Sequence, residues 1–187
     1  MRWIRFLILT YLVVLVQTTA GRLLVFRTSA VGMVGPDLLA LLAVFVALHV
    51  RNWADVMLAA WSLGLAVDLT TAGGPGGATV VGPMALAYAL TAGLLFRVRE
   101  AFFREQALTQ MLLAWAFCLL AHGLWVTAQW LLAPGEMTAS AYARTLGQAG
   151  ALAVYTALLM PLAHFALSKG QRLLLTGPAS RGRRGRR

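Results

Sequence analysis

The sequence predicts an all-α integral membrane protein, a bundle of about six transmembrane helices with both chain ends in the cytoplasm. Hydrophobic residues make up 60% of the 187 positions and charged residues only 12%, whereas soluble domains have about 45–50% and 25%. The apolar residues form long runs, and most basic residues lie between these runs or near the end of the chain. The chain has more apolar residues than one small globular core can bury. We therefore expect lipid to cover the rest of the apolar surface.

Six apolar runs have about the length that a membrane-crossing helix needs, which is roughly 20 residues. We expect them to form one polytopic transmembrane domain over residues 1–175. The last residues, 176–187, are rich in Gly, Ser and Arg, and we expect a disordered basic cytoplasmic tail there. The predicted spans lie near residues 4–24, 34–50, 54–71, 80–96, 107–132 and 146–167.

The first run also has features of a signal peptide. Arg2 and Arg5 precede the apolar residues, and Thr18 and Ala20 resemble a cleavage site. In multi-spanning proteins such a run more often remains as the first helix, and we expect that outcome here.

The distribution of Lys and Arg predicts the orientation. Counted on alternating sides of the six spans, 13 basic residues fall on the side of the chain ends and only Arg22, Arg27 and Arg144 on the other. Positive charge marks the cytoplasmic side. Both ends are therefore expected in the cytoplasm, and without the five arginines of the tail the count is still 8 against 3.

Composition also excludes several functions. A net charge of +10 suggests nucleic-acid binding, but the apolar segments offer no basic face for it. The single cysteine, Cys118, excludes an intrachain disulfide and a thiolate metal cluster. Neither a set of serine, histidine and acid nor a cluster of acids for magnesium is present. We expect no enzyme activity, no catalytic residues, no metal and no cofactor.

Asp37 is the first acid placed in a predicted span. It follows Pro36, which suits the first position of a helix, and an acid in the first turn complements the helix dipole. This structural role is sufficient to explain the residue. A contact with a partner protein remains the alternative.

Asp68 is harder to explain, because it lies in the last turn of its predicted helix and opposes the dipole. Ala60, Gly64 and Asp68 recur every four residues and share one face, where small residues allow close helix packing. Four roles remain open for Asp68: a solvent-exposed position at the membrane interface, a structural pairing with Arg22 or Arg27, docking of a partner protein, and ion coupling. The turn that follows is expected on the outer side as a tight, partly embedded turn, and it contains Gly73, Gly74, Pro75 and Gly76.

Two histidines lie within predicted spans. His122 shares a face with Cys118 and Ala114, and His164 follows Pro161 by three residues. A metal site needs more ligands than the spans offer nearby. We therefore expect both to be buried, hydrogen-bonded residues.

Residues 36–97 resemble the MreD family of rod shape-determining proteins, which are small multi-pass proteins of the bacterial inner membrane. The likeness rests on Pro-Asp-Leu-Leu at 36–39, Gly-Leu-Ala-Val-Asp-Leu at 64–69, the glycine and proline turn at 73–76, and Ala-Leu-Ala-Tyr-Ala-Leu at 85–90. It covers about a third of the chain. The turn here has more glycine than is usual in the family, and the arginine-rich tail is not typical of it.

The resemblance implies a non-enzymatic scaffold of the complex that directs lateral peptidoglycan synthesis and cell shape. Its implied partners are the bitopic protein MreC, the actin-like MreB, the glycosyltransferase RodA and a penicillin-binding transpeptidase. The candidate contact or helix-packing residues are Asp37, Gly64, Asp68, Gly73, Gly74, Pro75 and Gly76.

Two further readings accompany this one. A substrate-binding membrane subunit of a vitamin importer of the energy-coupling type would have a similar architecture, and it requires a polar or aromatic-lined cavity that opens outward.

The basic tail is expected either to enforce topology or to contact anionic membrane lipids. The residues for that contact are Arg181, Arg183, Arg184, Arg186 and Arg187.

Overall fold

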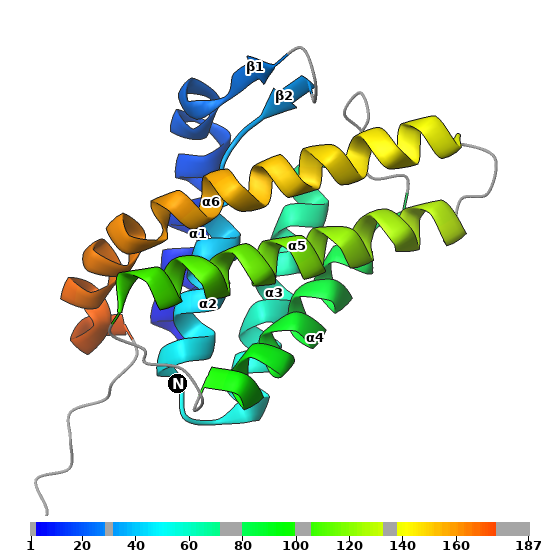
Figure 1. Ribbon diagram of the computed structural model, residues 1–187. Helices are drawn as coiled ribbons and strands as arrows, with labels where there is room; N and C mark the ends of the chain where they lie inside the picture. The colour runs from blue at the N-terminus through cyan, green and yellow to red at the C-terminus, as the bar shows by residue number, and fades with distance from the viewer. Residues whose placement is uncertain (1–2, 29–31, 72–79, 100–105, 133–137, 175–187) are drawn as a thin grey trace, which may run out of the picture.

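The computed structural model describes residues 3–28, 32–71, 80–99, 106–132 and 138–174. Six α-helices make up most of this part of the chain (Figure 1), as expected for an all-α protein. Their bounds are α1 (Trp3–Thr18), α2 (Leu38–His49), α3 (Trp53–Thr71), α4 (Pro83–Val98), α5 (Ala107–Leu132) and α6 (Ala139–Leu174). Between α1 and α2 lie a 3-10 helix, η1 (Ala20–Leu24), and two short strands, β1 (Phe26–Thr28) and β2 (Gly32–Val34).

Three helices are long and apolar enough to cross a membrane, namely α3, α5 and α6 over Ala139–Lys169. The predicted bounds of the third and fifth spans agree with α3 and α5 to within one residue. The other three helices are apolar but shorter, with 16 residues in α1, 12 in α2 and 16 in α4. Large apolar side chains cover much of the outer surface, for example Ile4, Leu86 and Leu162, which are 60–77% exposed.

The first two predicted spans are partly wrong. The predicted first span reaches residue 24, but α1 ends at Thr18, where the hydroxyls of Thr18 and Thr19 donate to backbone carbonyls of the preceding turn. The predicted second span begins at residue 34, in the antiparallel hairpin of β1 and β2. Hydropathy alone did not separate these short strands from the helices beside them.

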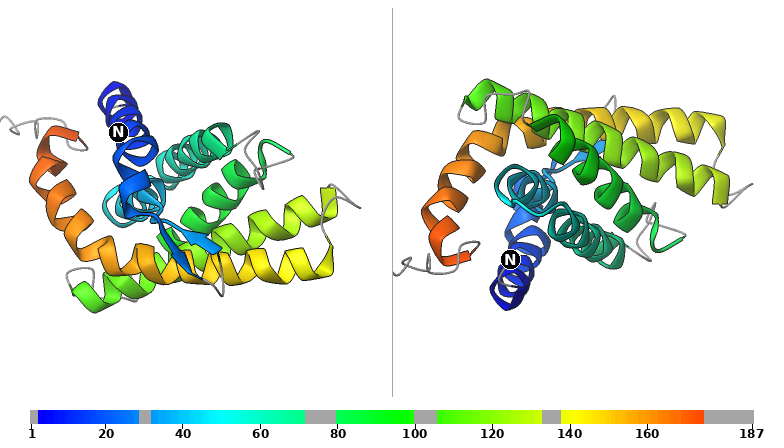
Figure 2. Two further views of the ribbon diagram at one scale, coloured as in Figure 1. Left: turned by 90° about the horizontal axis from the view of Figure 1, so that it is seen from above. Right: turned by 90° about the horizontal axis from the view of Figure 1, so that it is seen from below.

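The short helix α2 is the centre of the molecule. It contacts each of the other α-helices, and ten of its 12 residues are buried. In the view from below, α2 lies at the corner between α1 and the orange end of α6 (Figure 2). At 1.5 Å per residue a 12-residue helix is about 18 Å long. Its N-terminal end lies inside the protein, where Asp37 is buried, whereas its C-terminal end is followed by the exposed residues Arg51 and Asn52.

Four of the remaining helices pack as two pairs around α2. α3 packs against α4, and α5 lies beside α6 (Figure 1). α6 is longer than predicted and changes direction along its length (Figure 2). It contains Pro161, which lacks a backbone N–H and bends a helix. The bend carries the C-terminal part of α6 away from α5.

The small-residue face predicted from sequence lies at the interface between α3 and α4. Ala60, Gly64 and Asp68 are all buried, which confirms that they share an inward face. A Cβ atom built on Gly64 would lie 2.5 Å from the carbonyl oxygen of Met84 and 2.8 Å from Ala85 Cα. Glycine at this position therefore lets the two backbones approach more closely than any other residue allows.

Candidate functional site

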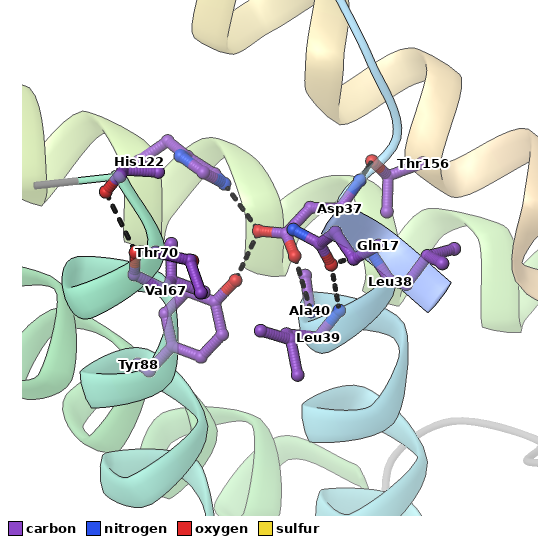
Figure 3. A network of polar contacts seen from close by, with 11 residues as sticks. Gln17, Asp37, Leu38, Leu39, Ala40, Val67, Thr70, Tyr88, His122 and Thr156 are labelled. Atoms are coloured by element: carbon purple, nitrogen blue, oxygen red, sulfur yellow. Dashed lines mark hydrogen bonds and ion pairs between the residues drawn. The ribbon is translucent and has the colours of Figure 1, made fainter. Parts of the chain in front are cut away.

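The N-terminal end of α2 is a buried polar cluster, and Asp37 is its central residue (Figure 3). Asp37 is the N-cap of the helix, and its Oδ1 accepts a hydrogen bond of 3.0 Å from the backbone N–H of Ala40. The predicted position was two residues off, because the first helical residue is Leu38 rather than Pro36 and Asp37 precedes the first turn. The structural role proposed for Asp37 is nevertheless confirmed, since an N-cap carboxylate satisfies a helix donor that has no partner within the helix.

Two other helices complete this cap. The backbone N–H of Asp37 donates to Thr156 Oγ1 of α6 at 3.0 Å. Gln17 Oε1 of α1 accepts from the N–H groups of Leu38 and Leu39 at 3.0 and 3.2 Å. The first N–H groups of a helix otherwise need water or a side chain. A helix that begins inside the bundle thus receives its partners from residues far away in the sequence.

The second oxygen of Asp37 joins α4 and α5. Oδ2 accepts from the hydroxyl of Tyr88 and lies 3.1 Å from His122 Nε2 (Figure 3). Tyr88 is fully buried and His122 is 8% exposed. One carboxylate therefore contacts side chains of two helices and the backbone of a third. The prediction that His122 is a buried, hydrogen-bonded residue is confirmed.

Asp68 has a similar role at the start of α4. Its Oδ2 accepts from the backbone N–H groups of Gly82, Met84 and Ala85 at 2.9, 3.1 and 3.3 Å. Pro83 between them has no N–H, and Gly82 has a φ of 119°, which favours glycine. The acid at the end of α3 therefore lies at the positive end of the next helix dipole, which is favourable.

This arrangement corrects two expectations for Asp68. The residue is fully buried, so it is neither a wet interfacial acid nor exposed to a partner protein. Among the described side chains Arg27 makes no ion pair with it, and the side chain of Arg22 lies outside the description. Among the described residues, the hydrogen-bond partners of Asp68 are the backbone amides at the start of α4.

Replacement of Asp68 tests this cap directly. Asp68→Ala leaves two buried N–H groups and one partly buried N–H group without a partner, and each buried group costs about 1–3 kcal/mol. Asp68→Asn keeps an amide oxygen that accepts from the same groups. We expect faster amide hydrogen exchange over residues 80–90 in Asp68→Ala and near wild-type exchange in Asp68→Asn. Equal exchange in both variants would contradict the capping role.

Arg99 caps the other end of α2 and was not predicted as a site residue. Its Nη1 donates to the carbonyl oxygens of Ala47 and Val50 at 2.8 and 2.5 Å, and its guanidinium lies 3.8 Å from the centroid of the Phe96 ring. From the sequence, Arg99 is only one of the basic residues expected on the cytoplasmic side. It is 6% exposed, and no local pattern indicates that it reaches a helix some 50 residues earlier in the chain.

A small polar cavity adjoins the cluster at His122. It has a volume of about 140 Å³ and lies between β2, α5 and α6. His122, Trp125, Thr145 and Gln148 contribute polar groups to its wall, and Trp125 Nε1 is buried without a hydrogen-bond partner. The cavity is smaller than the roughly 300–1,000 Å³ of typical ligand sites.

The second histidine differs from its prediction. The His164 ring packs against Phe45 and His49, with centroids 5.6 and 5.2 Å apart. His164 is only partly buried and its Nδ1 has no hydrogen-bond partner, so the expectation of a buried, hydrogen-bonded residue is wrong for His164. Within the described ranges, no three His, Cys, Asp or Glu side chains lie close enough together to hold a metal ion.

Several predicted residues lie outside the described part of the chain. These are the residues of the glycine turn and the tail arginines, namely Gly73, Gly74, Pro75, Gly76, Arg181, Arg183, Arg184, Arg186 and Arg187.

The fold and the cluster define a general class, an all-α chain of apolar helices packed around a short central helix whose two ends are capped by distant side chains. No family model, curated protein or solved structure matches the chain.

Proposed function

We propose that this protein is a non-enzymatic membrane scaffold of the MreD type, acting in the bacterial complex for cell-wall elongation and cell shape. The observation that carries the proposal is the position of the motif residues. Asp37, Tyr88 and Asp68, which all lie in the stretch that resembles MreD, make the contacts that join α2, α3, α4 and α5. The motif residues join helices to one another. Motif residues of this kind favour a family defined by a shared fold rather than by a shared reaction.

In this proposal the chain crosses the bacterial inner membrane six times, with both ends in the cytoplasm. The short helices α1, α2 and α4 cross the membrane together with the segments that flank them. The hairpin of β1 and β2 lies above α2 and completes the crossing in the outer half of the membrane. Non-helical backbone at membrane depth is tolerated where protein buries it. The segment from Val34 to Asp37 meets this condition, because Val34, Pro36 and Asp37 are buried and Gly35 is partly buried.

The orientation is tested by cysteine labelling. Cys118 is the only cysteine and is buried, so its background labelling should be low. Met33→Cys in the exposed hairpin should react with a membrane-impermeant maleimide in intact spheroplasts. Asn52→Cys, between α2 and α3, should react only after permeabilisation. Labelling of Asn52→Cys from outside would overturn the orientation.

The scaffold role is tested with partners and cell shape. Full-length protein should co-purify with an MreC-like bitopic protein, and more weakly with MreB, RodA and a penicillin-binding transpeptidase. Its depletion should turn rod-shaped cells into spheres. A photo-crosslinking amino acid at Leu86, an exposed site on α4, and one at Leu162, on α6, should give different crosslinks to the bitopic partner. Normal cell shape after complete depletion would refute the proposal.

The cavity beside His122 favours a second candidate, the substrate-binding subunit of a vitamin importer. It is polar, contains Trp125 in its wall and adjoins the hairpin, on the proposed outer side. Its volume of about 140 Å³ argues against a ligand as large as a vitamin. Thiamine, riboflavin and biotin should therefore leave the melting temperature of the purified protein unchanged, and a clear stabilisation by one of them would favour the importer.

A further inference from the structure

The small cavity between β2, α5 and α6 combines apolar and polar walls. Val126 and Leu152 are among its apolar lining residues, and Trp125 and Gln148 are among those with polar groups. β2 lies against α6 beside the cavity, and the hairpin reaches α6 in the view from above (Figure 2). A molecule in this cavity therefore contacts the hairpin and both helices of the α5–α6 pair.

The polar wall offers donors that have no partner. Trp125 Nε1 is buried and makes no hydrogen bond within the described part of the chain. An indole N–H can only donate, so the missing partner is an acceptor. Among the described residues no Asp or Glu lines the cavity, and Asp37 contacts His122, which does. The wall is therefore suited to a ligand that accepts hydrogen bonds.

Two exposed arginines lie beside the cavity. Arg27 is directly opposite Met33 in the hairpin, and such cross-strand pairs share one face of a sheet. Met33 lines the cavity, so Arg27 is on the same hairpin face as a lining residue. On α6, Arg144 precedes the lining residue Gln148 by four positions and shares its side of the helix. Positive charge at this place favours an anionic ligand.

The volume limits the size of the ligand. An engineered protein cavity of about 150 Å³ binds benzene, a molecule of about six non-hydrogen atoms. The cavity beside His122 has nearly the same volume, about 140 Å³. A carboxylate group uses half of those atoms, and a short aliphatic part is left for the apolar wall.

We propose that this cavity binds a short-chain carboxylate, whose oxygens accept from Trp125 Nε1 and Gln148 Nε2. The aliphatic end contacts the apolar wall, and the charges of Arg27 and Arg144 attract the anion. An amide of the same size lacks this attraction, and an amine of the same length brings a further donor and a repelled charge. The inference goes beyond the scaffold role and does not rest on it.

Equilibrium dialysis of radiolabelled butyrate with the purified full-length protein in detergent tests the site. Butyrate should be retained above the level of protein-free micelles, and unlabelled butyrate should displace it. Butyramide and butylamine should be about tenfold less effective competitors, since hydrogen bonds to a charged acceptor are the stronger ones. Binding no higher than in micelles alone, or equal competition by butyramide, would overturn the proposal.

A conservative change of the indole tests the assigned donor. Trp125→Phe keeps an aromatic ring in the wall and removes the N–H, so butyrate binding should fall about tenfold. Trp115→Phe is the matched control, because Trp115 is another partly exposed tryptophan of α5 and does not line the cavity. It should bind butyrate as wild type does. Equal affinity of the two variants would refute the role of Trp125.

Replacement of exposed residues tests the charge without disturbing the core. Arg27→Gln combined with Arg144→Gln should weaken butyrate binding by about fivefold at low salt and by less at high salt. Arg51→Gln combined with Arg97→Gln is the matched control, with the same change of net charge at exposed positions outside the cavity. Equal loss in both double variants would contradict the proposal. Partner binding and cell shape are separate measurements, so failure here leaves the scaffold proposal standing.

Discussion

Asp37→Ala is expected to destabilise the protein by about 2–6 kcal/mol, because two buried donors lose their acceptor and each such loss costs about 1–3 kcal/mol. The change removes the acceptor for the Ala40 N–H and the Tyr88 hydroxyl, and the contact with His122 Nε2. Tyr88 is fully buried and His122 nearly so, so little water can replace the carboxylate. The expected result is a large fall in melting temperature in detergent.

Asn52→Ala is the matched control for Asp37→Ala. Asn52 Oδ1 accepts from the N–H of Ala54 at 3.3 Å, and this cap at the start of α3 is exposed. Loss of a surface cap costs about 0.5–2 kcal/mol, because water solvates the freed amide. If the two variants melt at the same temperature, the buried cluster contributes no more than an ordinary cap, and its central role is wrong.

Gly64→Ala is expected to be the most damaging single-methyl change in the described part of the chain. Its Cβ would lie 2.5 Å from the Met84 carbonyl oxygen and 2.8 Å from Ala85 Cα, and both are backbone atoms that cannot rotate away. α3 and α4 must therefore separate. Overpacking costs about 1–3 kcal/mol where side chains adjust, and we expect at least the upper part of this range here.

Gly123→Ala gives the opposite expectation. A Cβ at Gly123 in α5 meets no atom within 4 Å, and replacing glycine by alanine inside a helix stabilises by roughly 0.5–1 kcal/mol. Thermal unfolding of the two variants should therefore shift in opposite directions. A neutral or stabilising Gly64→Ala would show that α3 and α4 do not pack as closely as described.

The sequence predicted the bounds of α3 and α5 well and those of the other helices less well. α3 and α5 are continuous apolar runs, and their bounds were predicted to within one residue. α2 was predicted four residues too early, and the hairpin of β1 and β2 was missed. Hydropathy indicates only how apolar a residue is. The buried strand residue Val34 therefore gives the same hydropathy signal as a residue in a buried helix.

The candidate site was predicted only in part. Spacing placed Gly64 and Asp68 on one inward face, and it indicated that His122 is buried. Spacing could not identify the hydrogen-bond partners of Asp68. The unpaired donors and acceptors at a helix end are backbone groups, which occur throughout the chain and are not marked by residue type. Arg99 was missed for the same reason, since its partners are the carbonyl groups of Ala47 and Val50.

The sequence alone determined that the chain is made of apolar helices with small-residue faces, because composition and periodicity are properties of each segment by itself. Only the tertiary structure decided that α2 is the central helix and that Asp37, Asp68 and Arg99 cap helix ends. The physical reason is that unpaired backbone groups at a buried helix end must be satisfied. The residue that satisfies them is chosen by proximity in space, which no local pattern encodes.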